Sequence, residues 1–172
     1  MSRTRGAGLT TALIAVVVVI GVNVLPSAAQ EPPPPPIASE ILTGRAVFTD
    51  DVDLKLKIKL DGKQTTVVNA EDPSRTLVAR FTVQPGAEFP WHSHAGPVIV
   101  NVTKGELVYV GAEDCVERSY PAGTAFVDPG HGHVHTAFNP TDGETVLVAS
   151  FYEAPEQGPL LIPADAPSDC DM

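Results

Sequence analysis

The chain has 172 residues, of which 11 are basic and 21 are acidic, so its formal net charge is −10. This balance excludes nucleic acids and anionic membrane surfaces as partners that bind by charge, because both are negatively charged themselves. Hydrophobic residues make up 43% of the chain and charged residues 19%, which is typical of one folded domain and excludes wholesale disorder.

The first 29 residues have the pattern of a secretory signal peptide. Arg3 and Arg5 form a short positive region, residues 9–25 are mostly apolar and uncharged, and small residues end at Ala29. This order predicts export with cleavage after Ala29. An uncleaved membrane anchor is the alternative, because the apolar run is only slightly shorter than a bilayer-spanning helix. We therefore expect a secreted or otherwise extracytoplasmic protein, which contacts a membrane only if this segment is retained.

Residues 30–40 are expected to form a linker. They include an unbroken run of five prolines at positions 32–36. Proline fixes φ and has no backbone N–H, so this run favours a stiff polyproline II spacer.

The rest of the chain has the pattern of short β-strands. Residues 54–60 alternate leucine or isoleucine with lysine, which predicts a half-buried strand. Asp61 and Gly62 predict a hairpin turn, with residues 64–68 returning. Breaks rich in proline, glycine and asparagine separate the further expected strands, which are 76–83, 97–103, 106–110, 124–127, 133–138 and 145–152. Such strands, without a helical pattern, predict an all-β sandwich or barrel.

All five histidines lie in two short segments. His92 and His94 form one cluster, and His131, His133 and His135 form the other. Residues two apart in an extended segment share a face, so each cluster can direct a pair of imidazoles toward one point. Imidazole is the commonest nitrogen ligand of divalent transition metals. The clustering favours a metal site over a set of solvent-exposed loop histidines.

The first histidine cluster lies in a segment that resembles the first motif of the cupin superfamily. That motif runs glycine, five residues, His-x-His, three residues, glutamate, six residues and glycine. The chain has Gly86, His92, His94 and Gly105 at these spacings. Val98 stands where the motif has its glutamate.

The second cluster resembles the second cupin motif, which runs glycine, five residues, Pro-x-Gly, two residues, histidine, three residues and asparagine. The chain has Gly123, Pro129, His135 and Asn139 in this order, with one residue inserted between Pro129 and His135. The step of three residues to Asn139 favours His135 as the motif histidine, and His133 is the alternative.

The resemblance covers about residues 41–153. Within the superfamily, the chain is similar to small, single-domain exported bacterial cupins of unassigned activity. It implies a cupin double-stranded β-helix, a jelly-roll barrel, over these residues, followed by a C-terminal tail at 154–172. It also implies a metal site whose ligands are His92, His94 and His135, or His133 in place of His135.

Val98 cannot bind a metal ion, so the implied site has three neutral histidines and does not compensate the charge of a divalent ion. Such a site favours hydroxide or an anionic ligand at its open positions. Manganese, iron, zinc, nickel and copper are all compatible with it.

Two classes of function follow from this site. One is a metal-dependent oxygenase or isomerase that acts on a small polar or anionic molecule. The other is a non-catalytic module that binds a metal or a small ligand, and a structural β-domain without metal is a third alternative. The catalytic residues stay unassigned, and so does the oligomeric state, for which a homodimer is open.

Two further groups of residues carry expectations. The chain has two cysteines, Cys115 and Cys170. An even number of cysteines in a chain expected to be exported favours a disulfide over two free thiols. This disulfide would fix the C-terminal tail against the barrel. The candidates to line a pocket are Phe89, Trp91, Phe126, Phe138 and Phe151, although core packing is the simpler role for Phe126 and Phe151. Trp91 is expected at the barrel mouth or an interface.

Overall fold

The computed structural model describes residues 33–59, 64–70 and 75–170. The signal peptide expected at residues 1–29 lies outside these residues. Within them the chain forms strands and no helix, which confirms the all-β prediction. The strands are β1 (Ile37–Val47), β2 (Leu54–Ile58), β3 (Thr66–Ala70), β4 (Arg75–Val83), β5 (His92–Ser93), β6 (Val98–Lys104), β7 (Glu106–Gly111), β8 (Glu117–Pro121), β9 (Ala125–Asp128), β10 (His135–Phe138), β11 (Thr145–Phe151) and β12 (Ile162–Pro163).

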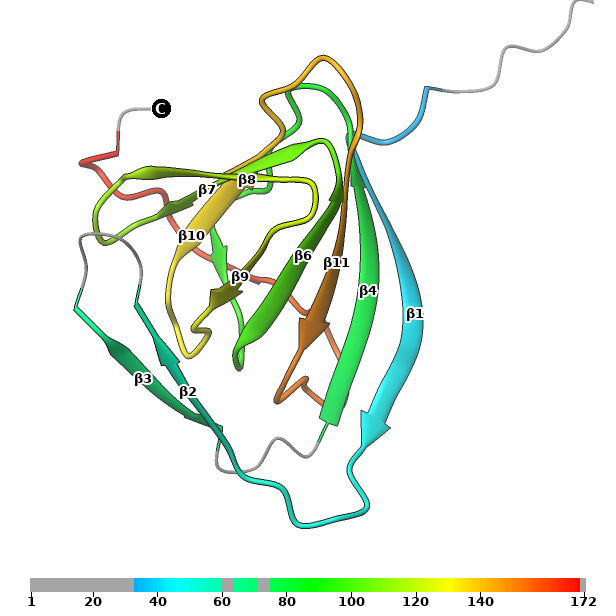
Figure 1. Cartoon of the computed structure of the whole chain (residues 1–172), viewed down its shortest axis with the longest axis vertical. Coiled ribbons are helices and arrows are strands. Elements are labelled where there is room, and N and C mark those ends of the chain that lie inside the picture. The colour runs from blue at the N-terminus through cyan, green and yellow to red at the C-terminus, as the bar shows by residue number, and fades with distance from the viewer. Residues whose placement is uncertain (1–32, 60–63, 71–74, 171–172) are drawn as a thin grey trace, which may run out of the picture. The chain divides into compact units, whose positions relative to one another are not determined.

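Two five-stranded antiparallel sheets form the barrel (Figure 1). The strand order is β1-β4-β11-β6-β9 in one sheet and β12-β5-β10-β7-β8 in the other. One buried hydrophobic cluster draws on both sheets, with Leu77 and Phe151 from the first and Tyr109 and Ala137 from the second. The architecture is the double-stranded β-helix that the cupin resemblance implies.

Side chains that alternate between buried and more exposed positions along the central strands build this core. In β4 every second side chain from Leu77 to Val83 is buried, and β11 alternates in the same way from Thr145 to Phe151. The two strands pair in register, with Leu77 opposite Phe151. Successive side chains of a strand point to opposite faces, so one face of this pair enters the core. Full burial of one such leucine or phenylalanine stabilises the fold by about 1.5–3 kcal/mol.

The lysine-rich segment forms the expected hairpin. β2 pairs antiparallel with β3, from Leu54 opposite Ala70 to Ile58 opposite Thr66, in a separate two-stranded sheet. Lys55 and Lys57 are exposed, whereas Val68 and Ala70 are buried. The turn expected at Asp61 and Gly62 lies outside the described residues.

β1 is a strand that the sequence pattern does not predict. It begins at Ile37, inside the segment expected to be a linker, and pairs with β4 along its whole length. Most of its side chains are exposed, including Ile41 and Val47. An edge strand that is held by backbone hydrogen bonds needs no buried face, so it lacks the alternation that signals a strand.

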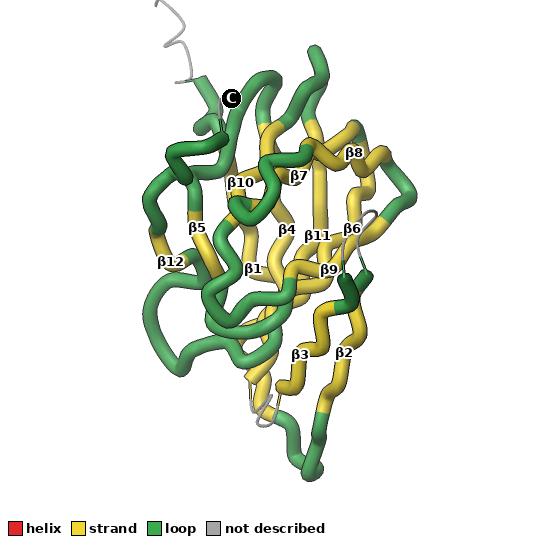
Figure 2. Tube along the Cα trace, turned by 90° about the vertical axis from the view of Figure 1, so that its left-hand side faces the viewer, coloured by secondary structure: helices red, strands yellow, loops and turns green. Residues whose placement is uncertain are grey.

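The C-terminal segment returns to the barrel beside the histidine strands (Figure 2). β12 pairs with β5, where Pro163 is opposite His92. Cys115 and Cys170 are joined as a disulfide, with their Cα atoms 5.2 Å apart. The segment beyond residue 153, expected to be a tail, therefore contributes a strand next to the histidines. In the described part of the chain no helix is long and apolar enough to cross a membrane.

Candidate metal centre

Pairing of short strands brings three of the five histidines together. His92 on β5 lies directly opposite His135 on β10, and His94 follows His92 by two residues. One ring nitrogen of each lies within 4.8 Å of the others. The ring centroids are 4.3 Å apart for His92 and His135 and 4.8 Å apart for His92 and His94. All three side chains are at most 6% exposed.

Backbone carbonyls fix the orientation of two of these rings. Nδ1 of His92 lies 2.6 Å from the carbonyl oxygen of Pro90, and Nδ1 of His94 lies 2.8 Å from that of Leu160. A carbonyl oxygen only accepts hydrogen bonds, so each Nδ1 carries the proton. The lone pair of each ring is therefore on Nε2, which is the tautomer of a histidine ligand whose other nitrogen is held by the protein.

Burial keeps the three imidazoles neutral. It lowers the pKa of His92 to about 4 and that of His135 to about 3, and it also lowers the pKa of His94. Desolvation disfavours the charged imidazolium, which is the main cause of all three shifts. A metal ion needs the neutral imidazole, so these histidines are ready to bind at neutral pH without losing a proton.

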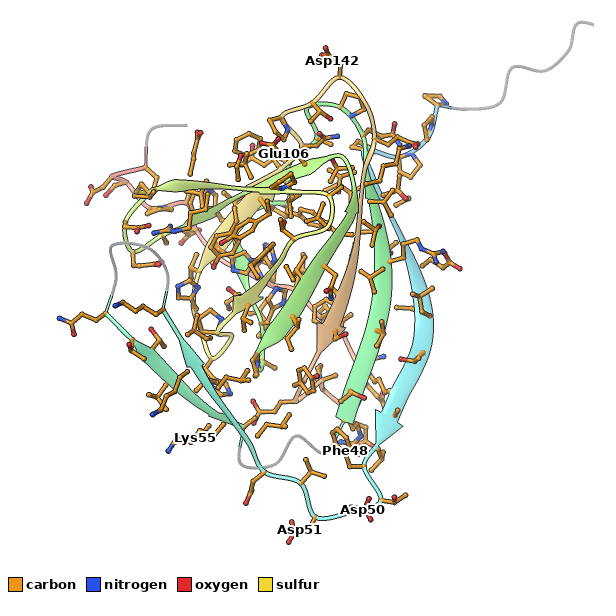
Figure 3. The ribbon with its side chains drawn as sticks, viewed as in Figure 1. Phe48, Asp50, Asp51, Lys55, Glu106 and Asp142 are labelled. Carbon is orange, nitrogen blue, oxygen red and sulfur yellow. A yellow bond between two sulfur atoms is a disulfide. The ribbon has the colours of Figure 1, made fainter. Side chains whose placement is uncertain are left out.

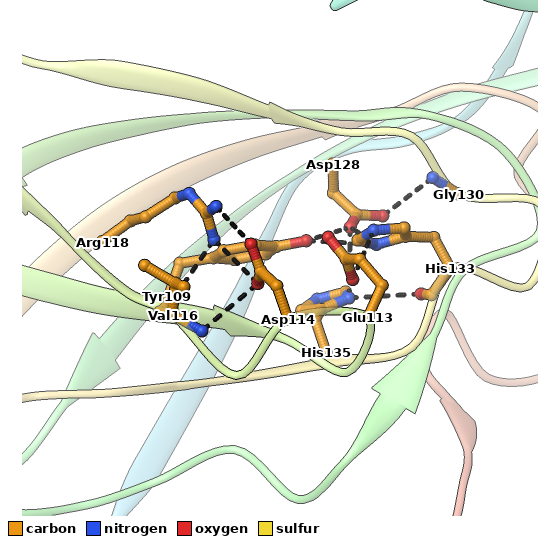
Figure 4. Close-up of polar contacts among 9 residues, drawn as sticks. All are labelled: Tyr109, Glu113, Asp114, Val116, Arg118, Asp128, Gly130, His133 and His135. Carbon is orange, nitrogen blue, oxygen red and sulfur yellow. Dashed lines mark hydrogen bonds and ion pairs between the residues drawn. The ribbon is translucent and has the colours of Figure 1, made fainter. Parts of the chain in front are cut away.

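A buried carboxylate supports His135 from its other side. Oδ2 of Asp128 lies 3.1 Å from Nδ1 of His135, 3.2 Å from Nδ1 of His133 and 2.9 Å from the hydroxyl of Tyr109 (Figure 4). Oδ1 of Asp128 accepts a 2.9 Å hydrogen bond from the backbone N–H of Gly130. Asp128 is 1% exposed, so these bonds replace the water that a carboxylate otherwise needs.

The same hydrogen bonds set the charges of this cluster. Burial alone would raise the pKa of Asp128, but the His133 hydrogen bond and nearby histidines outweigh it and lower the pKa to about 2. Burial alone would lower the pKa of His133, but the hydrogen bond to Asp128 raises it. Burial is the main cause that raises the pKa of Tyr109 well above its ordinary value, and the negative charge of Asp128 is the second. The hydroxyl of Tyr109 therefore keeps its proton.

His133 belongs to this supporting cluster and not to the group of three histidines. Its Nε2 lies 3.0 Å from Oε2 of Glu113, and the side chain is 21% exposed. Figure 4 shows the loop that carries Glu113 held by Arg118, which binds both carboxylate oxygens of Asp114. Of the two alternatives, the structure places His135 next to His92 and His94. His133 instead joins Asp128 and His135 in a second group of close donor atoms.

The other residues considered from the sequence lie elsewhere. His131 is exposed and forms an ion pair with Glu153. Glu88, the acid nearest the first cluster, is exposed and accepts a hydrogen bond from Thr136. Trp91 is half-buried and does not line the cavity beside the histidines.

Asn139, the last residue of the second motif, has a structural role. It is fully buried, and its Nδ2 donates to the carbonyl oxygens of Val83 and Gly143. Its Oδ1 accepts from the backbone N–H and hydroxyl of Thr141, so this side chain ties the turn before β11 to the end of β4.

The sequence pattern missed Asp128, Tyr109 and Glu113. A signal for Asp128 was available, because it lies two residues after Phe126 on a strand and therefore shares the inward face of that residue. No sequence signal identifies Glu113, which reaches His133 from a loop whose course depends on the Asp114–Arg118 pair.

A small cavity of about 50 Å³ opens beside the three histidines. Of the five aromatic candidates, Phe89, Phe126 and Phe151 line it, whereas Phe138 and Trp91 do not. Phe126 and Phe151 also belong to the hydrophobic core. The other lining residues are mainly apolar: Phe81, Val98, Val100, Leu107, Tyr109, Asp128, Ala137, Leu147, Ala149 and Leu161.

The donor set fits a divalent transition metal. Three neutral imidazole nitrogens converge within 4.8 Å, and nitrogen donors of this kind suit zinc, iron, nickel and copper. The open cavity beside them leaves room for a further ligand.

Comparison with known protein families identifies the barrel. Residues 79–151 match the family model described as "Cupin domain". This match confirms the resemblance to the cupin superfamily over these residues. The matched segment runs from the middle of β4 to the end of β11 and therefore includes all three histidines of the group. A search of curated proteins finds no match.

Solved structures with a similar chain course include other cupins. KdgF from Halomonas sp. has a TM-score of 0.48 at 16% identity, over 72% of this chain and 85% of that one. The polyketide cyclase RemF from Streptomyces resistomycificus has a TM-score of 0.45 at 19% identity, over 55% of this cupin and 64% of RemF, just under two thirds of its length. A cupin domain from Bordetella pertussis has a TM-score of 0.41 at 23% identity, over 62% and 99% of the two chains.

Proposed function

We propose that this cupin holds one divalent transition metal ion through His92, His94 and His135 and offers the remaining coordination positions to a small molecule. The observation that carries the proposal is the convergence of three buried ring nitrogens within 4.8 Å. The carbonyl contacts of His92 and His94 support it, because they leave Nε2 of each ring available.

The reaction that fits this site best is a metal-dependent oxygenation or isomerisation. The ion would supply Lewis acidity, and with a redox-active metal it would also activate oxygen. The protein's own residues orient and protect the site. The carbonyl oxygens of Pro90 and Leu160 hold two rings, and the third contacts the carbonyl oxygen of His133 and the carboxylate of Asp128. The phenylalanine side chains exclude water.

The second candidate function is a non-catalytic module that binds a metal or a small ligand. It is favoured by Val98, which lines the cavity where cupins of the usual motif carry a carboxylate. It is also favoured by Asp128, the one acid among the lining residues, because its two oxygens already accept hydrogen bonds from Tyr109 and Gly130. The disulfide supports an extracytoplasmic location for either function.

Metal content tests the proposal. The full chain would be expressed through an export route without an affinity tag, and metals per chain would be measured by mass spectrometry. We expect about one ion per chain, its loss in His94→Ala, and its retention in His131→Ala, a matched change of an exposed histidine. A wild-type chain that takes up no Mn²⁺, Fe²⁺, Ni²⁺, Cu²⁺ or Zn²⁺ would contradict the proposed function.

A further inference from the structure

The walls of the cavity beside the three histidines are mainly apolar, and Tyr109 and Asp128 are the polar lining residues besides the histidines. Four phenylalanine rings, those of Phe81, Phe89, Phe126 and Phe151, line it together with valine, leucine and alanine side chains. No lysine or arginine is among the lining residues. The wall therefore lacks a cationic side chain to match a phosphate or a second carboxylate.

The polar atoms of the lining already have partners. The hydroxyl of Tyr109 donates to Asp128, whose two oxygens accept from Tyr109 and Gly130. Nδ1 of His92 and of His94 is engaged by backbone carbonyls. A hydroxyl group on the ligand body would therefore lose its hydrogen bonds to water and find no replacement in the wall.

Several charged side chains lie on the outside of the described chain. Figure 3 shows Asp50, Asp51, Lys55 and Asp142 pointing away from the barrel, and all four are exposed. Asp128, beside His135, is the one charged side chain among the lining residues, so the histidine end is the polar end of the cavity.

The cavity is also small. Its volume of about 50 Å³ is far below the roughly 300–1,000 Å³ of drug-sized ligand pockets. One water molecule needs about 10–15 Å³ by the same measure, so the cavity has room for roughly three to five water-sized groups. A hexose has more than twice that number of non-hydrogen atoms and does not fit.

We propose that the ligand of this site is a small monoanion with one acidic oxygen group and an otherwise apolar body, such as a short alkanoate. This inference rests on the proposed function, because the bound ion would attract the acidic group: three neutral imidazoles leave the ion's charge uncompensated. The apolar wall then favours a ligand whose remaining part, beyond the acidic group, is apolar. Sugars, sugar phosphates and dicarboxylates are disfavoured by both the size of the cavity and its lining.

The test uses the full chain loaded with Co²⁺, whose visible absorption reports on ligands that enter its coordination sphere. Acetate, propionate, butyrate and 3-hydroxypropionate would be titrated, and bound cobalt per chain would be measured first. Each buried methylene group is expected to tighten binding about fourfold until the cavity is filled. We expect 3-hydroxypropionate, which matches butyrate in size, to bind at least tenfold more weakly than butyrate.

Two valine variants show whether the wall is responsible. Val100→Thr places a hydroxyl in the lining and should reduce the propionate-to-acetate affinity ratio. Val67→Thr makes the same change on the exposed face of β3 and should leave that ratio unchanged.

The outcomes separate the two proposals. A chain that binds no Co²⁺ overturns the proposed function and the ligand class with it. A chain that binds Co²⁺ but shows no gain from acetate to propionate, or prefers 3-hydroxypropionate to butyrate, overturns only the ligand class.

Discussion

Asp128 lies directly opposite Val98 in the antiparallel pairing of β6 and β9, and its carboxylate is 3.1 Å from Nδ1 of His135. Val98 occupies the position of the glutamate in the usual cupin motif. The chain therefore has a carboxylate on the neighbouring strand, in contact with a histidine of the group. Nδ1 of His135 is hydrogen-bonded to the carbonyl oxygen of His133 at 3.4 Å, so Asp128 acts on this ring through its negative charge. A carboxylate beside a ligating histidine increases the basicity of the ring.

Replacing this carboxylate should weaken metal binding without removing a ligand. Asp128→Asn keeps the size of the side chain but removes its charge, so we expect metal affinity to fall by about 10–100-fold. Competition with a chromophoric chelator for Zn²⁺ measures the change. Glu117→Gln, at an exposed position on β8, is the matched control and should keep wild-type affinity. Equal affinity in wild type and Asp128→Asn would show that the contact with His135 is not needed.

Stability of the metal-free chain should fall in mild acid. Burial lowers the pKa of His92 to about 4 and that of His135 to about 3, whereas an unfolded histidine titrates near about 6.5. Between these values the unfolded state binds more protons than the folded state. The stability that the buried neutral histidines contribute is therefore fully present above about pH 6.5 and is lost as the pH falls toward 4. These two groups give a slope of up to about 2.7 kcal/mol per pH unit, and His94, whose pKa burial also lowers, adds to it.

Urea unfolding of chelator-treated protein at several pH values measures this slope. His92→Gln removes one of the three titrating histidines and should reduce the slope. The raised pKa of His133 acts in the opposite direction but on the alkaline side, because that stability is complete below about pH 6.5 and declines as the pH rises through the folded pKa. Constant stability from pH 6.5 to 4.5 would contradict the burial of neutral histidines.

The disulfide should stabilise both the fold and the site. It closes a loop with a sequence separation of 55 residues, for which chain entropy gives about 4 kcal/mol at most. Cys115→Ser/Cys170→Ser should lower the free energy of unfolding by up to this amount. It should also weaken metal binding, because the segment that it anchors supplies the Leu160 carbonyl that holds His94.

Chemical denaturation of the double variant, with and without Zn²⁺, separates the two effects. Reduced wild-type protein is the control, since it lacks the bond but keeps both sulfur atoms. If the variant unfolds at the same urea concentration as the oxidised wild type, the cross-link does not stabilise the fold.

The parts of the fold that sequence predicts are those where side chains decide the structure. Leu77 and Phe81 alternate with half-buried or exposed residues, so β4 is visible as a strand, and the His-x-His spacing identifies one side of the metal site. β1 is held through its backbone and carries little hydrophobic signal. The contact between Leu160 and His94 joins residues 66 positions apart, and no local pattern predicts it.

The histidine-rich loop offers a matched pair of glycine substitutions. Gly130 has φ of +65°, and a Cβ atom there would lie 2.0 Å from the carbonyl oxygen of Gly96. Gly132 has φ of +83° but nothing within 4 Å of such an atom. Gly132→Ala should therefore cost about 1–2 kcal/mol of backbone strain, whereas Gly130→Ala must also displace the backbone beside it.

This displacement should reach the metal site, because the N–H of Gly130 donates to Oδ1 of Asp128. We expect Gly130→Ala to be less stable than Gly132→Ala and to bind Zn²⁺ more weakly, while Gly132→Ala keeps wild-type affinity. Thermal unfolding and chelator competition on the two variants measure both effects. Equal zinc affinities would mean that Asp128 keeps its position without the Gly130 hydrogen bond, and that Tyr109 and the two histidines suffice to hold it.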